Sequence, residues 1–287
     1  MNQFSKGAVH NKGSGGTLDQ GDTAKGLEAE ALRVVRAGDE VGVILRMIGP
    51  LAARYHCPQL IYEIKSSRVC ADIDLAGYAM QSTEIRQLFA SLGYNEDVEI
   101  NILHEDAGRL IFNHPETQLR ADVFMDELNF CHPLRRERCI RGRLPQADTA
   151  LERATFCHPI PWKGRLEVDN PTIPLAELVL ELTQVVDLDE QDLVEAATLL
   201  AAHEIADDDA DRINGAKIAE LCAQQWGLWQ ACSTNLKNVA AFLSQSDLKD
   251  DDRAVVGARI ATLLHLIDEY PKGAQWLQQG ATARRTP

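Results

Sequence analysis

The stretch that decides the fold is residues 68–75, which read RVCADIDL. Asp72 and Asp74 stand two positions apart in an otherwise apolar run that is typical of a β-strand. Alternate residues of a strand share a face, so we expect the two carboxylates to project together while Ile73 and Leu75 point into the core. Neighbouring carboxylates repel each other, and the usual reason to hold them together on a sheet is a hard cation such as Mg²⁺. The alternative is an exposed strand with two solvated aspartates.

A third carboxylate lies in a second strand-like run. Asp122 is the single acid within residues 120–124, which read RADVF. If this strand lies beside the first one, the three carboxylates converge. In two-metal phosphoryl chemistry a third carboxylate completes the metal site and helps to orient or deprotonate the attacking hydroxyl. An aspartate on a solvent-exposed face is the simpler alternative.

These residues carry a family resemblance. Residues 68–74 together with Asp122 resemble the core of the nucleotidyltransferase superfamily that includes DNA polymerase beta. They are similar in particular to the abortive-infection nucleotidyltransferase toxins of bacteria, in which an arginine stands four residues before the first aspartate, as Arg68 does here. Residues 164–178 also resemble the relatives' link from the sheet to the first C-terminal helix. The resemblance covers about residues 54–245.

The resemblance implies a Mg²⁺-dependent enzyme that transfers a nucleoside monophosphate from a nucleoside triphosphate to an acceptor and releases pyrophosphate. Asp72 and Asp74 would bind the metal with the triphosphate, and Asp122 would join the metal site and help to activate the acceptor. Arg68 would donate to phosphate oxygens, since a guanidinium offers several donors. The acceptor is unknown. In a toxin-type enzyme it is a tRNA or a protein, and a cognate antitoxin is then a possible partner.

Two departures from the family pattern keep a second function open. The superfamily usually has a Gly-Gly or Gly-Ser turn before the DxD strand, whereas residues 59–67 contain no glycine. By the resemblance, Ser66 and Ser67 would take the place of that turn and bind the nucleotide. Relatives also tend to carry a lysine in the helix after the link, where this sequence has Glu181, Leu182 and Thr183. A catalytically degenerate binding or regulatory protein with the same fold is therefore the alternative.

The patterning predicts an α+β fold with a nucleotidyltransferase-like mixed sheet and flanking helices, followed by a C-terminal helical bundle. Residues 1–22 are rich in Gly, Ser, Asn and Gln and are expected to be a disordered tail. Residues 23–170 are expected to form the α+β domain, with an insertion near residues 131–157 in which FCHPL at 130–134 recurs as FCHPI at 156–160. Residues 171–287 are expected to form the helical domain.

Periodicity places the individual elements. Helices are expected from Thr23, over residues 40–47 and over residues 84–92. Strands are expected at 59–64, 69–75, 98–103, 109–112 and 119–124, with a hairpin turn at 106–108. In the C-terminal part, helices are expected at 175–186, 190–203, 215–227, 229–245 and 251–269.

Charge and composition limit the classes of partner. The formal net charge of −14 argues against a broad nucleic-acid surface. Five arginines within residues 135–143 form one local basic patch, for which an exposed basic loop is the alternative. No apolar run reaches the ~18 residues that span a bilayer, and no signal segment is present, so we expect a cytoplasmic protein without a membrane partner. The seven scattered cysteines are expected to be reduced.

Overall fold

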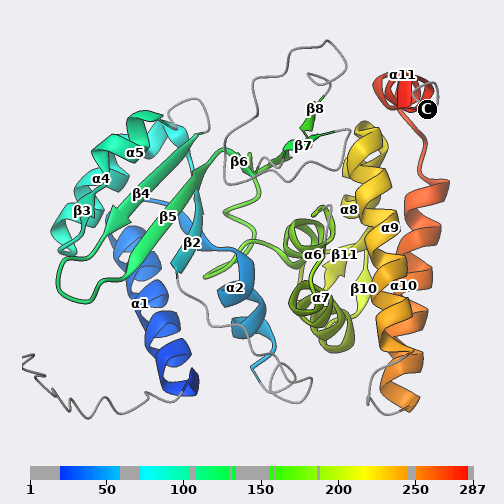
Figure 1. The fold of residues 1–287 in the computed structure, drawn as a ribbon, viewed down its shortest axis with the longest axis horizontal. Coiled ribbons are helices and arrows are strands. Elements are labelled where there is room, and N and C mark those ends of the chain that lie inside the picture. Colours follow the sequence, from blue (N-terminus) through cyan, green and yellow to red (C-terminus); the bar gives the residue numbers. More distant parts are fainter. Residues whose placement is uncertain are drawn as a thin grey trace, which may run out of the picture.

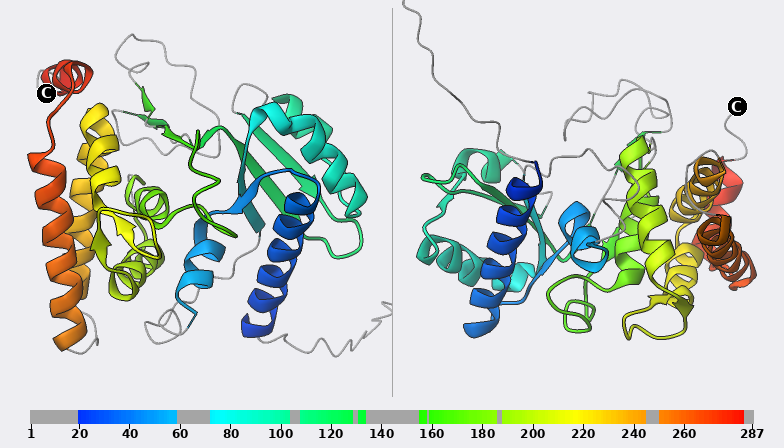
Figure 2. Two further views of the ribbon diagram at one scale, coloured as in Figure 1. Left: turned by 180° about the vertical axis from the view of Figure 1, so that it is seen from behind. Right: turned by 90° about the horizontal axis from the view of Figure 1, so that it is seen from below.

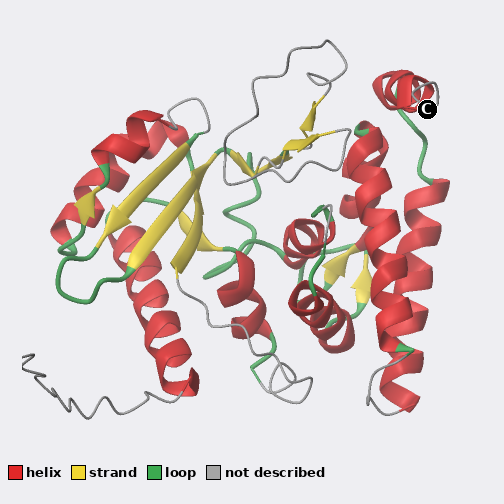
Figure 3. Cartoon of the chain, viewed as in Figure 1, coloured by secondary structure: helices red, strands yellow, loops and turns green. Residues whose placement is uncertain are grey.

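A computed structural model describes residues 20–58, 72–103, 108–128, 131–133, 155–157, 159–185, 188–244 and 250–283. It shows a mixed sheet flanked by helices, followed by a set of helices, which confirms the α+β class (Figures 1 and 3). Within these residues no helix has both the length and the apolar character required to cross a membrane.

The central sheet has five strands in the order β1-β2-β5-β4-β3. In chain order they are β1 (Leu45–Met47), β2 (Asp72–Gly77), β3 (Asn95–Glu96), β4 (Arg109–Asn113) and β5 (Arg120–Met125). Strands β2 and β5 pair in parallel, and every other pairing is antiparallel. Strands β4 and β5 confirm the strands expected at 109–112 and 119–124, and β2 confirms the described part of the strand expected at 69–75.

One face of this sheet is apolar and packs on two helices, α1 (Gln20–Glu40) and α4 (Ser82–Ser91). Helix α4 confirms the helix expected at 84–92. The Phe89 ring of α4 stacks on Phe112 of β4 with 4.0 Å between ring centroids. Alternation along the strands turns Ile73 and Val123 toward these helices, and both are fully buried. Residues Asp72 and Asp74 therefore project from the opposite face.

Residues 98–103 form a helix, α5 (Val98–Leu103), and the prediction of a strand there was wrong. Their alternating apolar pattern is typical of a strand, but Asp97 starts a helix by accepting a hydrogen bond from the Ile100 N–H at 3.2 Å. Asn101 then turns inward and is buried. Its side chain bonds both the N–H of Ile111, at 2.8 Å, and the C=O of Ile111, at 3.3 Å. Asn101 thus satisfies the N–H of Ile111 beyond the end of the short pairing between β3 and β4, and it shares the C=O of Ile111 with the N–H of Asp97. Gly108 consequently leads from a helix into β4 and is not the turn of a β-hairpin.

The second helix expected at residues 40–47 is also absent. Helix α1 continues to Glu40, the chain turns at Gly42 with a φ of 76°, and β1 follows. Pairing of β1 with β2 buries Leu45 and Met47 against the sheet, which a short helix over these residues would not do. Helix α1 begins at Gln20, so residues 20–22, expected in the tail, form its first turn. The rest of the expected tail lies outside the described residues.

The chain leaves the sheet after β5 and later returns to it. Strand β6 (Glu127–Leu128) pairs with β9 (Ile160–Pro161), and β7 (Cys131–Pro133) pairs with β8 (Thr155–Cys157). The two copies of the FCHP repeat therefore pair with each other, with Cys131 opposite Cys157. The chain then runs beside β1, where Met47 donates to the C=O of Pro171 at 2.8 Å and accepts from Ile173 at 3.1 Å.

The C-terminal part confirms the helices expected from periodicity: α6 (Leu175–Thr183), α7 (Glu190–Ala202), α8 (Gly215–Gln224), α9 (Trp226–Leu243) and α10 (Asp250–Glu269). A further helix, α11 (Ala274–Ala283), and a small parallel pair, β10 (Ile205–Ala206) with β11 (Ile213–Asn214), were not expected. Helix α2 (Gly49–His56) lies between the sheet and the helices α6 and α7 (Figures 1 and 2).

Replacing Asn101 with Ala should lower the free energy of unfolding by about 2 kcal/mol, because the buried N–H of Ile111 loses its acceptor, whereas the C=O of Ile111 keeps the N–H of Asp97. Urea denaturation followed by circular dichroism measures the change. The exposed Asn95, changed to Ala, is the matched control and should stay within about 0.5 kcal/mol of the natural protein. Equal losses in the two variants would contradict the role assigned to Asn101.

Candidate functional site

The carboxylates of β2 and β5 meet on the sheet face that the helices α1 and α4 leave open. The parallel pairing sets Asp74 directly opposite Asp122 and Asp72 opposite Arg120. This register confirms the expectation that the strand of Asp122 lies beside the strand of Asp72 and Asp74. Asp122 is buried, whereas Asp72 and Asp74 are partly exposed. Three acidic side chains thus share one small region of the sheet.

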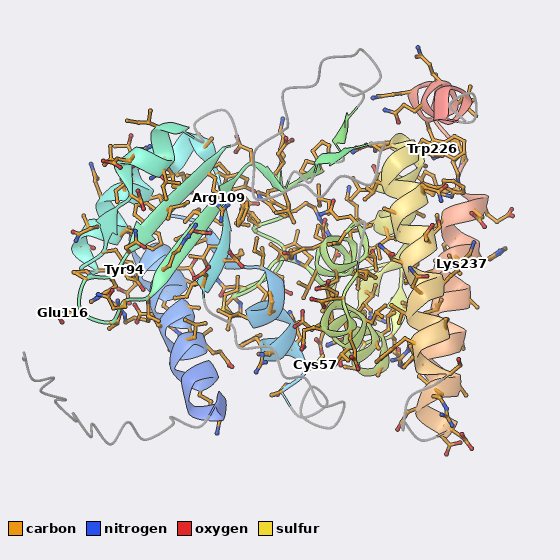
Figure 4. All side chains as sticks on the ribbon, viewed as in Figure 1. Cys57, Tyr94, Arg109, Glu116, Trp226 and Lys237 are labelled. Atoms are coloured by element: carbon orange, nitrogen blue, oxygen red, sulfur yellow. The ribbon has the colours of Figure 1, made fainter. Side chains whose placement is uncertain are left out.

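Asp122 is neutralised by two arginines. Arg120 donates from Nε to Oδ1 at 2.9 Å and from Nη2 to Oδ2 at 3.2 Å, and Arg109 of β4 also donates to Oδ2. Arg109 lies against the ring of Phe124, 4.9 Å from the ring centroid, which helps to hold the guanidinium in place (Figure 4). Both arginine side chains are about one-third exposed, so they also face solvent at the edge of the site.

Asp74 and Asp72 have no such partner. Neither carboxylate makes a hydrogen bond or ion pair with any residue in the described ranges. Burial, together with the negative charges of Asp122 and Asp72, raises the pKa of Asp74 to about 6 against the lowering effect of Arg109. A carboxylate with a raised pKa and no cation beside it is a poorly stabilised anion.

Helix α6 contributes a fourth acid. Burial raises the pKa of Glu181 to about 8, and the charge of Asp74 adds to the shift. Its Oε2 accepts a hydrogen bond from the N–H of Gly49 at 3.0 Å. Gly49 has a φ of 65°, and a Cβ there would stand 3.6 Å from Oδ2 of Asp74 and 3.7 Å from Oε1 of Glu181. The start of α2 therefore approaches both carboxylates with bare backbone.

The donor set fits Mg²⁺ at Asp72 and Asp74. Mg²⁺ prefers oxygen ligands and commonly takes one or two carboxylates, completing its shell with water and phosphate. Two unpartnered carboxylates on one face match that need. Asp122 fits less directly, because it would have to exchange at least one arginine for a cation. Consistently, the three acids do not form a tight ligand cluster within the described ranges.

Three of the residues expected at the site lie outside the described residues: Arg68, Ser66 and Ser67. The arginines within residues 135–143 do so as well. The structure instead adds Arg109, Arg120, Glu181 and Gly49. Of these, only Arg120 could have been placed beside Asp122 from strand periodicity, since it stands two positions before Asp122 in the same strand and shares its face. The other three reach the site through tertiary contacts between segments far apart in sequence.

The sequence was compared with protein-family models and with curated proteins. No protein-family model matches the chain, and no curated protein shows detectable sequence similarity to it.

Replacing Glu181 with Gln should weaken the dependence of stability on pH. The pKa values of Asp74 and Glu181 are raised, so these two carboxyl groups hold more protons in the folded protein than in the unfolded chain up to about pH 8. The free energy of unfolding therefore falls as pH rises through this window. The amide of Gln still accepts from Gly49 but cannot ionise, so the variant should lose less stability between pH 5 and pH 9.

Urea denaturation at several pH values in the presence of a chelator tests this expectation. The exposed Glu204, changed to Gln, is the control and should follow the natural protein at every pH. If the curve of the Glu181→Gln variant also ran parallel to that of the natural protein, Glu181 would not be the titrating group.

Proposed function

We propose that this protein is a Mg²⁺-dependent nucleotidyltransferase that moves a nucleoside monophosphate from a nucleoside triphosphate to an acceptor. The observation that carries the proposal is the register of β2 and β5, which sets Asp74 opposite Asp122 with Asp72 on the same face. This is the arrangement that the resemblance of residues 68–74 and Asp122 to the nucleotidyltransferase superfamily leads one to expect. We propose in addition that the α+β part has the fold of that superfamily.

Gly49 supports the proposal by supplying the glycine turn that residues 59–67 lack. It stands between β1 and α2, it has a positive φ, and it approaches Asp74 without a side chain. Backbone N–H groups at the start of a helix favour phosphate oxygens. The N–H of Gly49 donates a hydrogen bond to the carboxylate of Glu181. This N–H group therefore already has an anionic oxygen as its acceptor. In the proposed complex a phosphate oxygen takes that place.

In the proposed reaction the chain's own groups bind, orient and neutralise. Bound Mg²⁺ would supply charge neutralisation for the triphosphate and pyrophosphate. Asp72 and Asp74 hold the ion, and Arg109 and Arg120 face solvent beside them as donors to phosphate oxygens. The acceptor oxygen bonds to the α-phosphorus, the bond to the pyrophosphate oxygen breaks, and the acceptor's proton passes to a carboxylate. Asp122 is that carboxylate once an arginine has moved from it to phosphate.

A second candidate function is favoured by one specific observation. Glu181 lies beside Asp74 where the resemblance leads one to expect a phosphate-binding lysine. Each charge-assisted contact is worth on the order of 1.5–3 kcal/mol, so an acid at this position weakens triphosphate binding. A degenerate protein that keeps the fold and serves as a binding or regulatory module fits this feature.

Labelled-nucleotide transfer tests the enzyme. With each α-labelled triphosphate, cell extract as a source of acceptor, and Mg²⁺, the natural protein should yield a labelled product. Asp72→Asn and Asp74→Asn should each reduce the yield by about a hundredfold or more, because the metal loses a ligand. The exposed Asp251, changed to Asn, should retain full activity. If transfer persisted in the Asp72→Asn, Asp74→Asn double variant, these two residues would not be the metal ligands of the reaction.

Calorimetry separates the enzyme from the degenerate module. ATP, GTP, CTP and UTP are each titrated into the protein with Mg²⁺. Heat of binding with at least one of them, lost in the double variant, supports the enzyme. No heat with any of the four supports the module.

A further inference from the structure

A second group of ligand-type side chains lies at the other end of α2. His56 is in the last turn of this helix and Cys57 follows it. His203 caps the end of α7, and Asp211 lies in the loop between β10 and β11. No local spacing in the sequence links these residues, because Cys57 and His203 are 146 positions apart. Figure 4 shows Cys57 at the end of α2, facing α7.

The side chains converge closely. One nitrogen from each imidazole and one carboxylate oxygen of Asp211 all lie within 4.8 Å of one another. The rings of His56 and His203 stand edge to face, with 5.5 Å between centroids. Nδ1 of His203 is 3.4 Å from Oδ1 of Asp211. Two imidazoles with a carboxylate are a common ligand set for borderline divalent metals.

We propose that His56, His203 and Asp211 bind a divalent transition metal ion of the zinc class. Ligands about 2.0–2.1 Å from a tetrahedral ion stand about 3.4 Å apart. The present separations of up to 4.8 Å therefore require each ligand to move inward by less than about 1 Å. Rotation of the half-buried His56 and the exposed Asp211 side chains toward the buried His203 supplies most of this movement without a change in the backbone.

The surroundings suit a metal ligand set. Metal-binding histidines usually use their second nitrogen to contact an oxygen that fixes the ring. Nε2 of His56 is 2.7 Å from Oγ1 of the buried Thr172, which leaves Nδ1 of this ring for the ion. Burial lowers the pKa of His56, which favours the neutral ring that a metal needs. The Asp211 side chain is 82% exposed, so an ion has a path from solvent.

Cys57 is placed to complete the shell. Its Sγ is 3.8 Å from Nε2 of His203. Burial raises the pKa of this thiol to about 12, so without a metal it stays protonated. A bound ion would favour the thiolate, and the proton would be released to solvent. With Cys57 the site is closed and structural. Without Cys57 it keeps an open position.

An ion here would join the two parts of the chain. His56 belongs to the helix that begins at the carboxylates of the sheet, whereas His203 and Asp211 belong to the helical part. Binding to the folded protein alone would therefore raise the stability of the whole molecule.

The test uses the full-length chain without a histidine tag, stripped with a chelator and titrated with ZnCl₂ by calorimetry and by competition with a chromogenic chelator. We expect one Zn²⁺ per chain and a higher melting temperature. Asp211 has a φ of 55°, which Asn also tolerates, so Asp211→Asn should fold normally. It should weaken Zn²⁺ binding by at least about tenfold. The exposed Asp207 in the same loop, changed to Asn, should bind as the natural protein does.

Two further measurements complete the test. His56→Gln should also weaken binding, and Co²⁺ should give the intense visible bands of a four-coordinate ion. A near-ultraviolet sulfur-to-cobalt band that Cys57→Ser abolishes would add Cys57 to the ligands, and its absence would leave the three-ligand site. No saturable binding would overturn the proposal. So would binding that survives in both Asp211→Asn and His56→Gln, because it would belong to other cysteine and histidine residues. Neither outcome depends on nucleotide transfer.

Discussion

The in-register parallel pairing of β2 with β5 is the constraint on which the candidate site depends. It sets Asp74 opposite Asp122, and because side chains alternate across a strand, it also assigns Ile73, Leu75 and Val123 to the face covered by α1 and α4. A shift of one residue in either strand would bury an aspartate under the helices and expose a core residue. The hydrophobic core therefore enforces the geometry of the carboxylates.

Electrostatics then divides these carboxylates into two kinds. Asp122 is buried and compensated by Arg109 and Arg120, as a buried charge requires. Asp74 and Glu181 are not compensated in this way, and the pKa of each is raised. Asp122 and its two arginines stabilise the sheet itself. Asp74 and Glu181, which lack such partners, need a bound cation or a proton to balance their charge.

Helix α2 connects the features of functional interest. Its first residue, Gly49, brings backbone to Asp74 and Glu181, and its last residue, His56, meets His203 beside Asp211. Helix α2 is eight residues long and packs against β2, α6 and α7. Any change in the position of α2 would therefore be felt at both ends. Helix α2 thus contacts both the sheet and the helical part.

The amino-acid sequence by itself determined the elements whose pattern is local. The period of two in residues 72–75 placed Asp72 and Asp74 on one face, and periods near 3.6 located the helices from α6 to α10. Local pattern failed at residues 98–103, where alternation is typical of a strand but Asp97 and Asn101 stabilise a helix through side-chain bonds to the backbone.

Only the tertiary structure decided the rest of both sites. Gly49 and Glu181 are 132 positions apart, and His56, His203 and Asp211 meet only where the end of α2 packs beside α7. Periodicity reports which face a residue shares with its near neighbours. It carries no information about which distant segment that face will contact, because strand order and helix packing set those contacts.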